Sequence, residues 1–146
     1  MGTKMKAMNR WIFLSSILSF VTAAVHVFAG GPEVHDALLT ADLPIILKTY
    51  VSVIWHATTA VLVLDSIVLL IAAFRPDLRT AMIWIVVGQY LAYATLFVGY
   101  GLGYLGSLLA TPQWSVFVLI SAVALIGMKD RAVRAVPLPS REHSLP

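Results

Sequence analysis

The sequence predicts an all-α integral membrane protein, a four-helix up-down-up-down bundle with both termini in the cytoplasm. Composition is the first reason, because 60% of the 146 residues are hydrophobic and only 12% are charged, which leaves too little polar surface to solvate a globule. The second reason is that the apolar residues form long stretches, and a bilayer core of ~30 Å needs about 20 apolar residues per helix. The expected spans are residues 11–29, 50–74, 81–102 and 112–128, within one transmembrane domain of residues 1–130.

The basic residues determine the predicted orientation. Three basic residues lie at the start of the first span or before it, two lie between the second and third spans, and four follow the fourth span. The other two connections, residues 30–49 and 103–113, contain only Lys48. Cytoplasmic segments carry the excess of Lys and Arg, so both termini are placed in the cytoplasm. This orientation accounts for the net charge of +3 without a nucleic-acid partner. We expect a bacterial inner membrane, with the lipid bilayer as the main partner.

The first two spans are bounded by glycine and proline. The apolar run of the first span has about 19 residues, against ~7 to 15 for the core of a signal peptide, so we expect an uncleaved helix. Gly30-Gly31-Pro32 is expected to end this helix. Residues 30–49 then form the longest external segment, and Pro44 stands where the second helix can begin.

The later connections are short. Arg75-Pro76-Asp77 is a tight cytoplasmic turn in which Pro76 stops the second helix, so the second and third helices are expected to be antiparallel neighbours. Thr111-Pro112 closes the external connection 103–113 and starts the fourth helix. Residues 131–146 contain several prolines and no periodicity, and we expect a disordered cytoplasmic tail there.

Glycines of the third span suggest two different roles. Gly101, Gly103 and Gly106 match the spacing of a dinucleotide fingerprint, but that motif works between a strand and a helix, so no nucleotide partner is expected. Gly99 and Gly103 are four residues apart, a spacing that lets helix backbones approach closely in lipid. The Gly99/Gly103 face is therefore expected to pack, either within the bundle or in a homo- or hetero-oligomer.

Histidines near the external ends of the first two spans form the main candidate site. His26 and His56 are expected at matched depth on adjacent antiparallel helices, roughly 6 to 10 Å into the external leaflet. Glu33 and His35 follow His26 closely and can close over it. Neutral imidazole is the commonest metal ligand, and ionisable groups inside a membrane are costly enough to indicate function. We therefore expect these four residues to be the metal ligands.

The kind of metal is constrained by what the chain lacks. It contains no cysteine, so thiolate ligands are excluded, and no methionine lies in the external half of the spans. A divalent transition metal such as Zn, Cu(II) or Fe suits two imidazoles on helices packed at ~8 to 10 Å, whereas haem b needs a wider separation and is less favoured. The alternative is that each histidine only hydrogen-bonds a neighbouring helix.

Aromatic and amide side chains at the external ends extend this pocket. The residues expected to contact a cofactor are Trp55, Tyr100, Tyr104, Gln113 and Trp114. A quinone or a lipid is another ligand that fits beneath such a rim. The alternative is that the tryptophans belong to the aromatic belt at the membrane interface.

A second polar group lies deeper in the membrane. Counting from the cytoplasmic turn places Asp65 near the midplane, with Gln89 at the same depth on the third helix. One interpretation is a neutral Asp65 hydrogen-bonded to Gln89 or Tyr93, which joins the two helices. The other is a proton relay or transport step, for which buried acids are the usual device.

Two segments carry a resemblance to other proteins. The segment from His26 to Glu33 and the pair Trp55-His56 resemble small uncharacterised four-span inner-membrane proteins of bacteria, a resemblance that implies no activity. The leading hypothesis is an outward-facing His/acid pocket that binds a metal ion or a metal-containing cofactor, for electron transfer or metal handling. The alternatives are a non-catalytic membrane subunit or assembly factor, and a small proton-coupled transporter.

Overall fold

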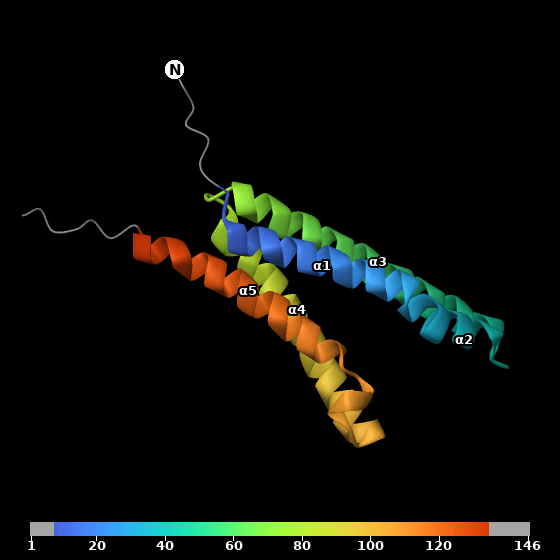
Figure 1. Ribbon diagram of the computed structural model, residues 1–146. Helices are drawn as coiled ribbons and strands as arrows, with labels where there is room; N and C mark the ends of the chain where they lie inside the picture. The colour runs from blue at the N-terminus through green and yellow to red at the C-terminus, as the bar shows by residue number, and fades with distance from the viewer. Residues whose placement is uncertain (1–7, 135–146) are drawn as a thin grey trace, which may run out of the picture.

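The computed structural model describes residues 8–134 of the chain, with side chains up to residue 129. The elements are α1 (Arg10–Phe28), the π-helical turn η1 (Gly31–His35), α2 (Asp36–Thr40), α3 (Ile45–Phe74), α4 (Arg79–Leu105), the 3-10 turn η2 (Leu108–Ala110) and α5 (Gln113–Arg134) (Figure 1). No strand occurs in this part of the chain, so the predicted all-α class is confirmed for it.

Three helical segments are long and apolar enough to cross a membrane: Arg10–Thr40, Ile45–Phe74 and Arg79–Leu105. The apolar part of α5, Gln113–Lys129, is shorter than these. The described residues therefore support a transmembrane protein with three full-length spans, where the sequence predicts four.

Helix boundaries agree with the sequence prediction at some ends and differ at others. α1 lies within one residue of the predicted first span at each end. α3 begins at Ile45, five residues earlier than predicted, because Pro44 has the fixed φ that suits the start of a helix. α5 continues to Arg134, so residues 131–134 of the predicted disordered tail are helical. The remainder of that tail, 135–146, lies outside the described residues.

The segment after α1 corrects one expectation. Gly30-Gly31-Pro32 was expected to lead into an external loop, but the chain continues as η1 and α2. A proline at position 32 lacks an amide hydrogen and clashes with the carbonyl four residues earlier, so an α-helix cannot continue unchanged. A wider π turn avoids this conflict: the amide of Asp36 donates to the carbonyl of Gly31. Glu33 and His35 thus lie on a rigid turn and not on a loop.

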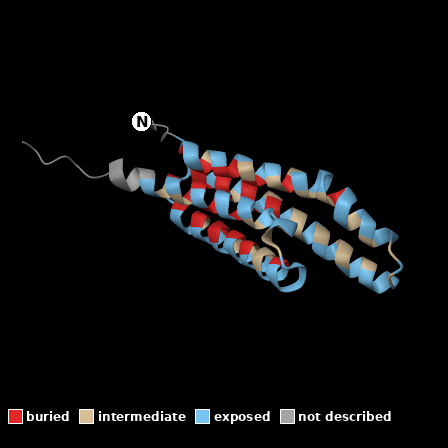
Figure 2. Ribbon diagram, turned by 60° about the horizontal axis from the view of Figure 1, so that its bottom comes forward, coloured by how far each residue is buried: buried red, intermediate tan, exposed pale blue. Residues whose placement is uncertain are grey.

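The helices form a bundle that is closed at one end and forked at the other. α1 packs against α3 and α5, and α4 packs against α5 and α3. Figure 1 shows the α1/α3 pair and the α4/α5 pair diverging away from the turn between α3 and α4. Buried residues gather in the half of the bundle next to that turn, while the two arms are mostly exposed (Figure 2).

Polar side chains hold the closed end together, and the sequence analysis did not identify them. Arg79 is 5% exposed, and its Nε and Nη2 donate to the carbonyls of Ala72 and Ala73 at the end of α3, at 2.9 and 3.0 Å. The amide of Asn9 also donates to Ala73, and its side-chain Nδ2 donates to the carbonyl of Gly127 at 2.7 Å. These bonds join the beginnings of α1 and α4 to the end of α3, where helix carbonyls are unpaired, and to the interior of α5 at Gly127.

The Gly99/Gly103 face is open in the structure. A Cβ added at Gly99 or Gly103 meets no atom within 4 Å, so this face does not pack within the bundle. The expectation that this face packs within the bundle is therefore wrong. The other expectation, contact with another protein molecule, stays a prediction.

Candidate functional site

Trp55 of α3 is the centre of an aromatic cluster at the α1/α3 arm. The ring of His26, from α1, stacks on it with ring centres 4.0 Å apart and an interplanar angle of 20°. The ring of His35, from η1, also lies nearly parallel to it, with ring centres 5.5 Å apart. A Cβ on Gly30 would lie 3.2 Å from the indole ring, so this glycine leaves the space that Trp55 fills. Trp55 therefore fixes the positions of two of the predicted ligands.

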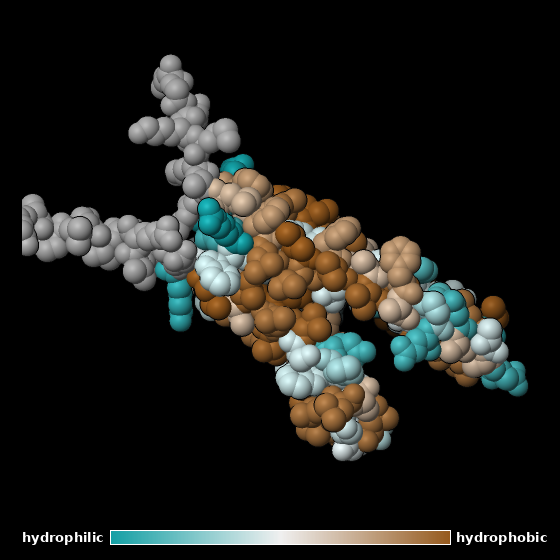
Figure 3. Space-filling model, in the orientation of Figure 1, coloured by the Kyte–Doolittle hydropathy of each residue, from teal (hydrophilic) through white to brown (hydrophobic). Residues whose placement is uncertain are grey.

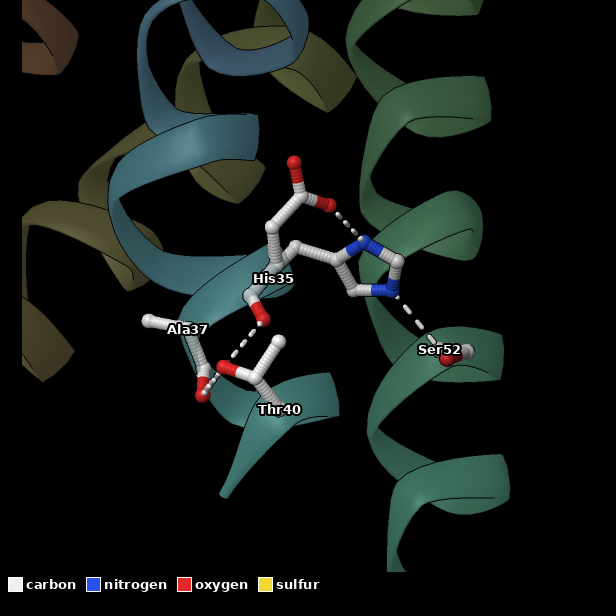
Figure 4. Close-up of polar contacts among 5 residues, drawn as sticks. His35, Ala37, Thr40 and Ser52 are labelled. Atoms are coloured by element: carbon white, nitrogen blue, oxygen red, sulfur yellow. Dashed lines mark hydrogen bonds and ion pairs between the residues drawn. The ribbon is translucent and has the colours of Figure 1, made fainter.

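His35 connects the π turn to α3 (Figure 4). Its Nε2 lies 3.1 Å from the hydroxyl oxygen of Ser52, and its Nδ1 lies 3.7 Å from Oδ1 of Asp36. The ring also meets that of His56 at nearly a right angle, with centres 5.4 Å apart and an interplanar angle of 68°. His35 therefore contacts the ring of His56 and also the ring of Trp55, on which His26 stacks.

His26 and His56 are related less directly than the sequence analysis expected. None of the ring contacts among the described residues joins these two histidines. His26 Nε2 lies 3.4 Å from the carbonyl oxygen of Trp55. The structure therefore places His26 and His35 against Trp55, and His35 in turn against His56.

The cluster lies at the edge of the membrane core. A core of ~30 Å takes about 20 helical residues, and counting 20 residues back from Phe74, the end of α3, reaches Trp55. The same count forward from Arg10 reaches Ala29, three residues beyond His26. His56 is exposed on the surface of the bundle, and Trp55 and His35 are half-buried.

The predicted ligands do not converge on one point. Glu33 is exposed on η1. Among the described residues, no group of three or more His, Asp or Glu side chains is arranged to hold a metal ion. The arrangement nevertheless offers two imidazoles in contact, and none of the described residues forms a hydrogen bond with the His56 ring.

The remaining predicted cofactor contacts lie on the other arm. Tyr100 and Tyr104 of α4 stack on each other with ring centres 5.4 Å apart, and both are exposed. Trp114 of α5 donates from its Nε1 to the carbonyl of Leu108, and Gln113 begins the same helix. Because the arms diverge, the structure does not bring these four residues to the histidines (Figure 1).

Asp65 and Gln89 lie opposite each other on α3 and α4, as counting residues from the turn between these helices predicts. Gln89 Nε2 donates to Oδ2 of Asp65 at 2.8 Å, and Tyr93 lies beside the same pair. The sequence analysis missed Tyr90, which is fully buried and shares a hydrogen bond with Ser19 of α1. The regular spacing of Ser15 and Ser19 was the signal for a buried partner, since Ser15 donates to the carbonyl of Ile120 in α5.

Polar residues on the inner surfaces of the fork are visible in Figure 3, where hydrophilic side chains interrupt the apolar surface beside the gap between the arms.

No protein-family model matches this chain, and neither the curated proteins nor the solved structures give a match.

Proposed function

We propose that this chain is a four-span protein of a bacterial inner membrane with both termini in the cytoplasm, and that its histidine cluster binds a transition-metal ion at the outer surface. The alternating basic residues support the orientation. α5 is the fourth crossing in this proposal, and its apolar part, Gln113–Lys129, reaches the lower limit of about 17 residues for a span.

The contact between His35 and His56 is the observation that carries the metal proposal. With metal–nitrogen bonds of about 2.0 Å, two imidazole ligands of one tetrahedral ion have ring centres about 5 Å apart. The observed separation is 5.4 Å. The hydrogen bond of His35 to Ser52 supports the proposal as well, since metal-binding imidazoles are usually oriented by a bond at the other nitrogen.

The surroundings favour a metal ion over haem b. His26 Nε2 faces the carbonyl oxygen of Trp55 at 3.4 Å, so a haem iron cannot bind that nitrogen without moving the helices apart. Asp36, whose Oδ1 lies 3.7 Å from His35 Nδ1, and the predicted ligands His26 and Glu33 are the side chains proposed to complete the ligand set, together with water. Two histidines and no thiolate fit Zn or Cu(II).

Metal content of the purified full chain tests this proposal. The protein in detergent is stripped with a chelator, reloaded with Zn or Cu(II), desalted and analysed for bound metal by elemental analysis. We expect about one ion per chain in the wild type and loss of it in His35→Ala and His56→Ala. His143→Ala is the matched control, because His143 is on the cytoplasmic side in the proposed topology. Absence of stoichiometric metal in the wild type would contradict the proposal.

A non-catalytic membrane subunit is the second candidate, and the forked shape favours it. The two arms diverge, and the Gly99/Gly103 face of α4 is open (Figure 1). A helix of a partner can approach closely at such a glycine face. In this case the histidine cluster serves to hold η1 against α3, and Gly99→Leu should disrupt the assembly while leaving the metal content unaffected.

A further inference from the structure

An open groove runs between α2 and the beginning of α3. Its volume is about 760 Å³. The side chains that define it are Leu39, Ile45, Lys48, Ser52, Val53 and His56. Thr49 completes the lining, and every lining residue except Leu39 lies on one stripe of α3, at positions i, i+3, i+4, i+7, i+8 and i+11. The volume falls in the range of about 300 to 1,000 Å³ that small-molecule sites have.

Lys48 is the charged residue of this groove. It is half-buried and lines the groove beside apolar side chains, as a lysine does when its stem covers apolar surface and its ammonium stays accessible. The ion pairs among the described residues are His35–Asp36 and Arg75–Asp77, so Lys48 has no carboxylate partner in that part of the chain. It is also the only basic residue of the connections 30–49 and 103–113. An ammonium without a counter-charge among these residues is free to pair with an anion from outside the chain, such as a lipid phosphate.

The rest of the groove wall indicates what kind of anion fits. On α3, Ile45 precedes Lys48 and Val53 follows it, and Leu39 of α2 lines the same groove. Lys48 is seven residues beyond Trp55, or about 10 Å along α3, and its long side chain can reach the lipid headgroups. Ser52 can add a hydrogen bond to a phosphate oxygen when His35 Nε2 donates to the Ser52 oxygen.

We propose that this groove binds one anionic phospholipid of the outer leaflet. Lys48 and Ser52 hold the phosphate, Leu39 and Ile45 shield the headgroup from water, and an acyl chain passes Val53 into the bilayer. This inference goes beyond metal binding and does not depend on it. His56 borders both sites, so the test is carried out with a chelator present and metal absent.

Binding of short-chain lipids to the full-length protein in detergent tests the proposal by calorimetry. The probes are a short-chain phosphatidylglycerol, the matching phosphatidylcholine and inorganic phosphate. We expect one phosphatidylglycerol per chain, bound about fivefold to tenfold more tightly than phosphatidylcholine, since one Lys near a membrane contributes roughly that factor. Lys48→Gln should remove this preference and Lys48→Arg should retain it. Lys129→Gln is the control, because Lys129 is exposed on α5.

The following results would overturn the proposal that Lys48 recognises an anionic phospholipid. Equal affinity of the wild type for the two lipids, or a preference that survives in Lys48→Gln, excludes recognition by Lys48. Inorganic phosphate that competes at the same concentration as phosphatidylglycerol indicates a free-anion site in place of a lipid site. If Lys48→Gln does not fold, the wild type still decides the question: added salt should weaken phosphatidylglycerol binding and leave phosphatidylcholine binding unchanged.

Discussion

Gln89 donates a 2.8 Å hydrogen bond from its Nε2 to Oδ2 of Asp65, which joins α4 to α3 in the buried part of the bundle. Polar contacts between membrane helices are worth ~0.6 to 2 kcal/mol. Asp65→Asn retains an acceptor oxygen and should leave the free energy of unfolding nearly unchanged. Asp65→Leu removes the acceptor and should lower this free energy by about 0.6 to 2 kcal/mol, measured by denaturation in mixed micelles.

The same variants separate a packing role from proton transfer. Gln89→Leu should cost as much as Asp65→Leu, and the double variant should cost no more than either one, because both remove the same bond. A folded Asp65→Asn protein that loses a pH-dependent transport activity would contradict the packing role and favour a relay.

Gly101 and Gly99 form a matched pair on one helix. A Cβ at Gly101 would lie 2.4 Å from Oγ1 of Thr111 and 3.1 Å from the carbonyl oxygen of Ser107. Thr111 cannot move away without losing its 3.0 Å hydrogen bond to the carbonyl of Phe97. Gly101→Ala should therefore destabilise the protein by about 1 to 3 kcal/mol, as overpacking does.

Gly99→Ala is the control for this prediction, because a Cβ there meets no atom within 4 Å. It should leave the protein as stable or raise the free energy of unfolding by up to about 1 kcal/mol, since Ala is the better helix former. Thermal unfolding of both variants in detergent gives the comparison. Equal effects of the two substitutions would show that the turn after α4 is more adaptable than the structure indicates.

Arg79 and Arg75 differ in their surroundings although both flank the turn between α3 and α4. Arg79 is buried and donates to two carbonyls at the end of α3. Arg79→Met should lower the free energy of unfolding by about 1.5 to 3 kcal/mol, the range for hydrogen bonds to charged groups. Arg75 is exposed, and its hydrogen bonds to Asp77 raise the pKa of its guanidinium. Arg75→Met should leave denaturation unchanged, because exposed ion pairs contribute little.

Local signals explain what could be predicted from the sequence. Hydrophobic length locates α1, α3 and α4, since each must bury its backbone polar groups within one apolar segment. Depth counting pairs Asp65 with Gln89 because a helix has a fixed rise per residue. Both inferences need only positions along one helix and one turn.

Tertiary packing decides what the sequence did not reveal. The divergence of the two arms separates Tyr100 and Trp114 from the histidines, and it depends on crossing angles set by many side chains at once. The choice of His35 as the partner of His56 depends on the π turn, which resolves a local conflict at Pro32. Neither the helix crossing angles nor the π turn follows from a regular spacing of residue types in the sequence.

Topology is testable with reporters. The distribution of basic residues predicts that a reporter fused after Pro146 and one inserted near Leu38 lie on opposite sides of the membrane. Paired alkaline phosphatase and fluorescent-protein fusions in bacterial cells provide the measurement. Three crossings in place of four would place the C-terminus outside, and this result would exclude α5 as a span.

The histidine cluster predicts non-additive effects on metal affinity. His26→Ala, His35→Ala and His56→Ala should each lower the affinity, and the His26/His56 double variant should lose no more than the more severe single variant, because ligands of one site act as a unit. Affinity should also fall as the pH drops through about 6, since only neutral imidazole binds a metal. Equilibrium metal titrations between pH 5 and 8 on chelator-stripped protein provide both measurements. If the three histidines only pack around Trp55, their substitution should change the unfolding temperature at every pH and leave metal binding absent or unaffected.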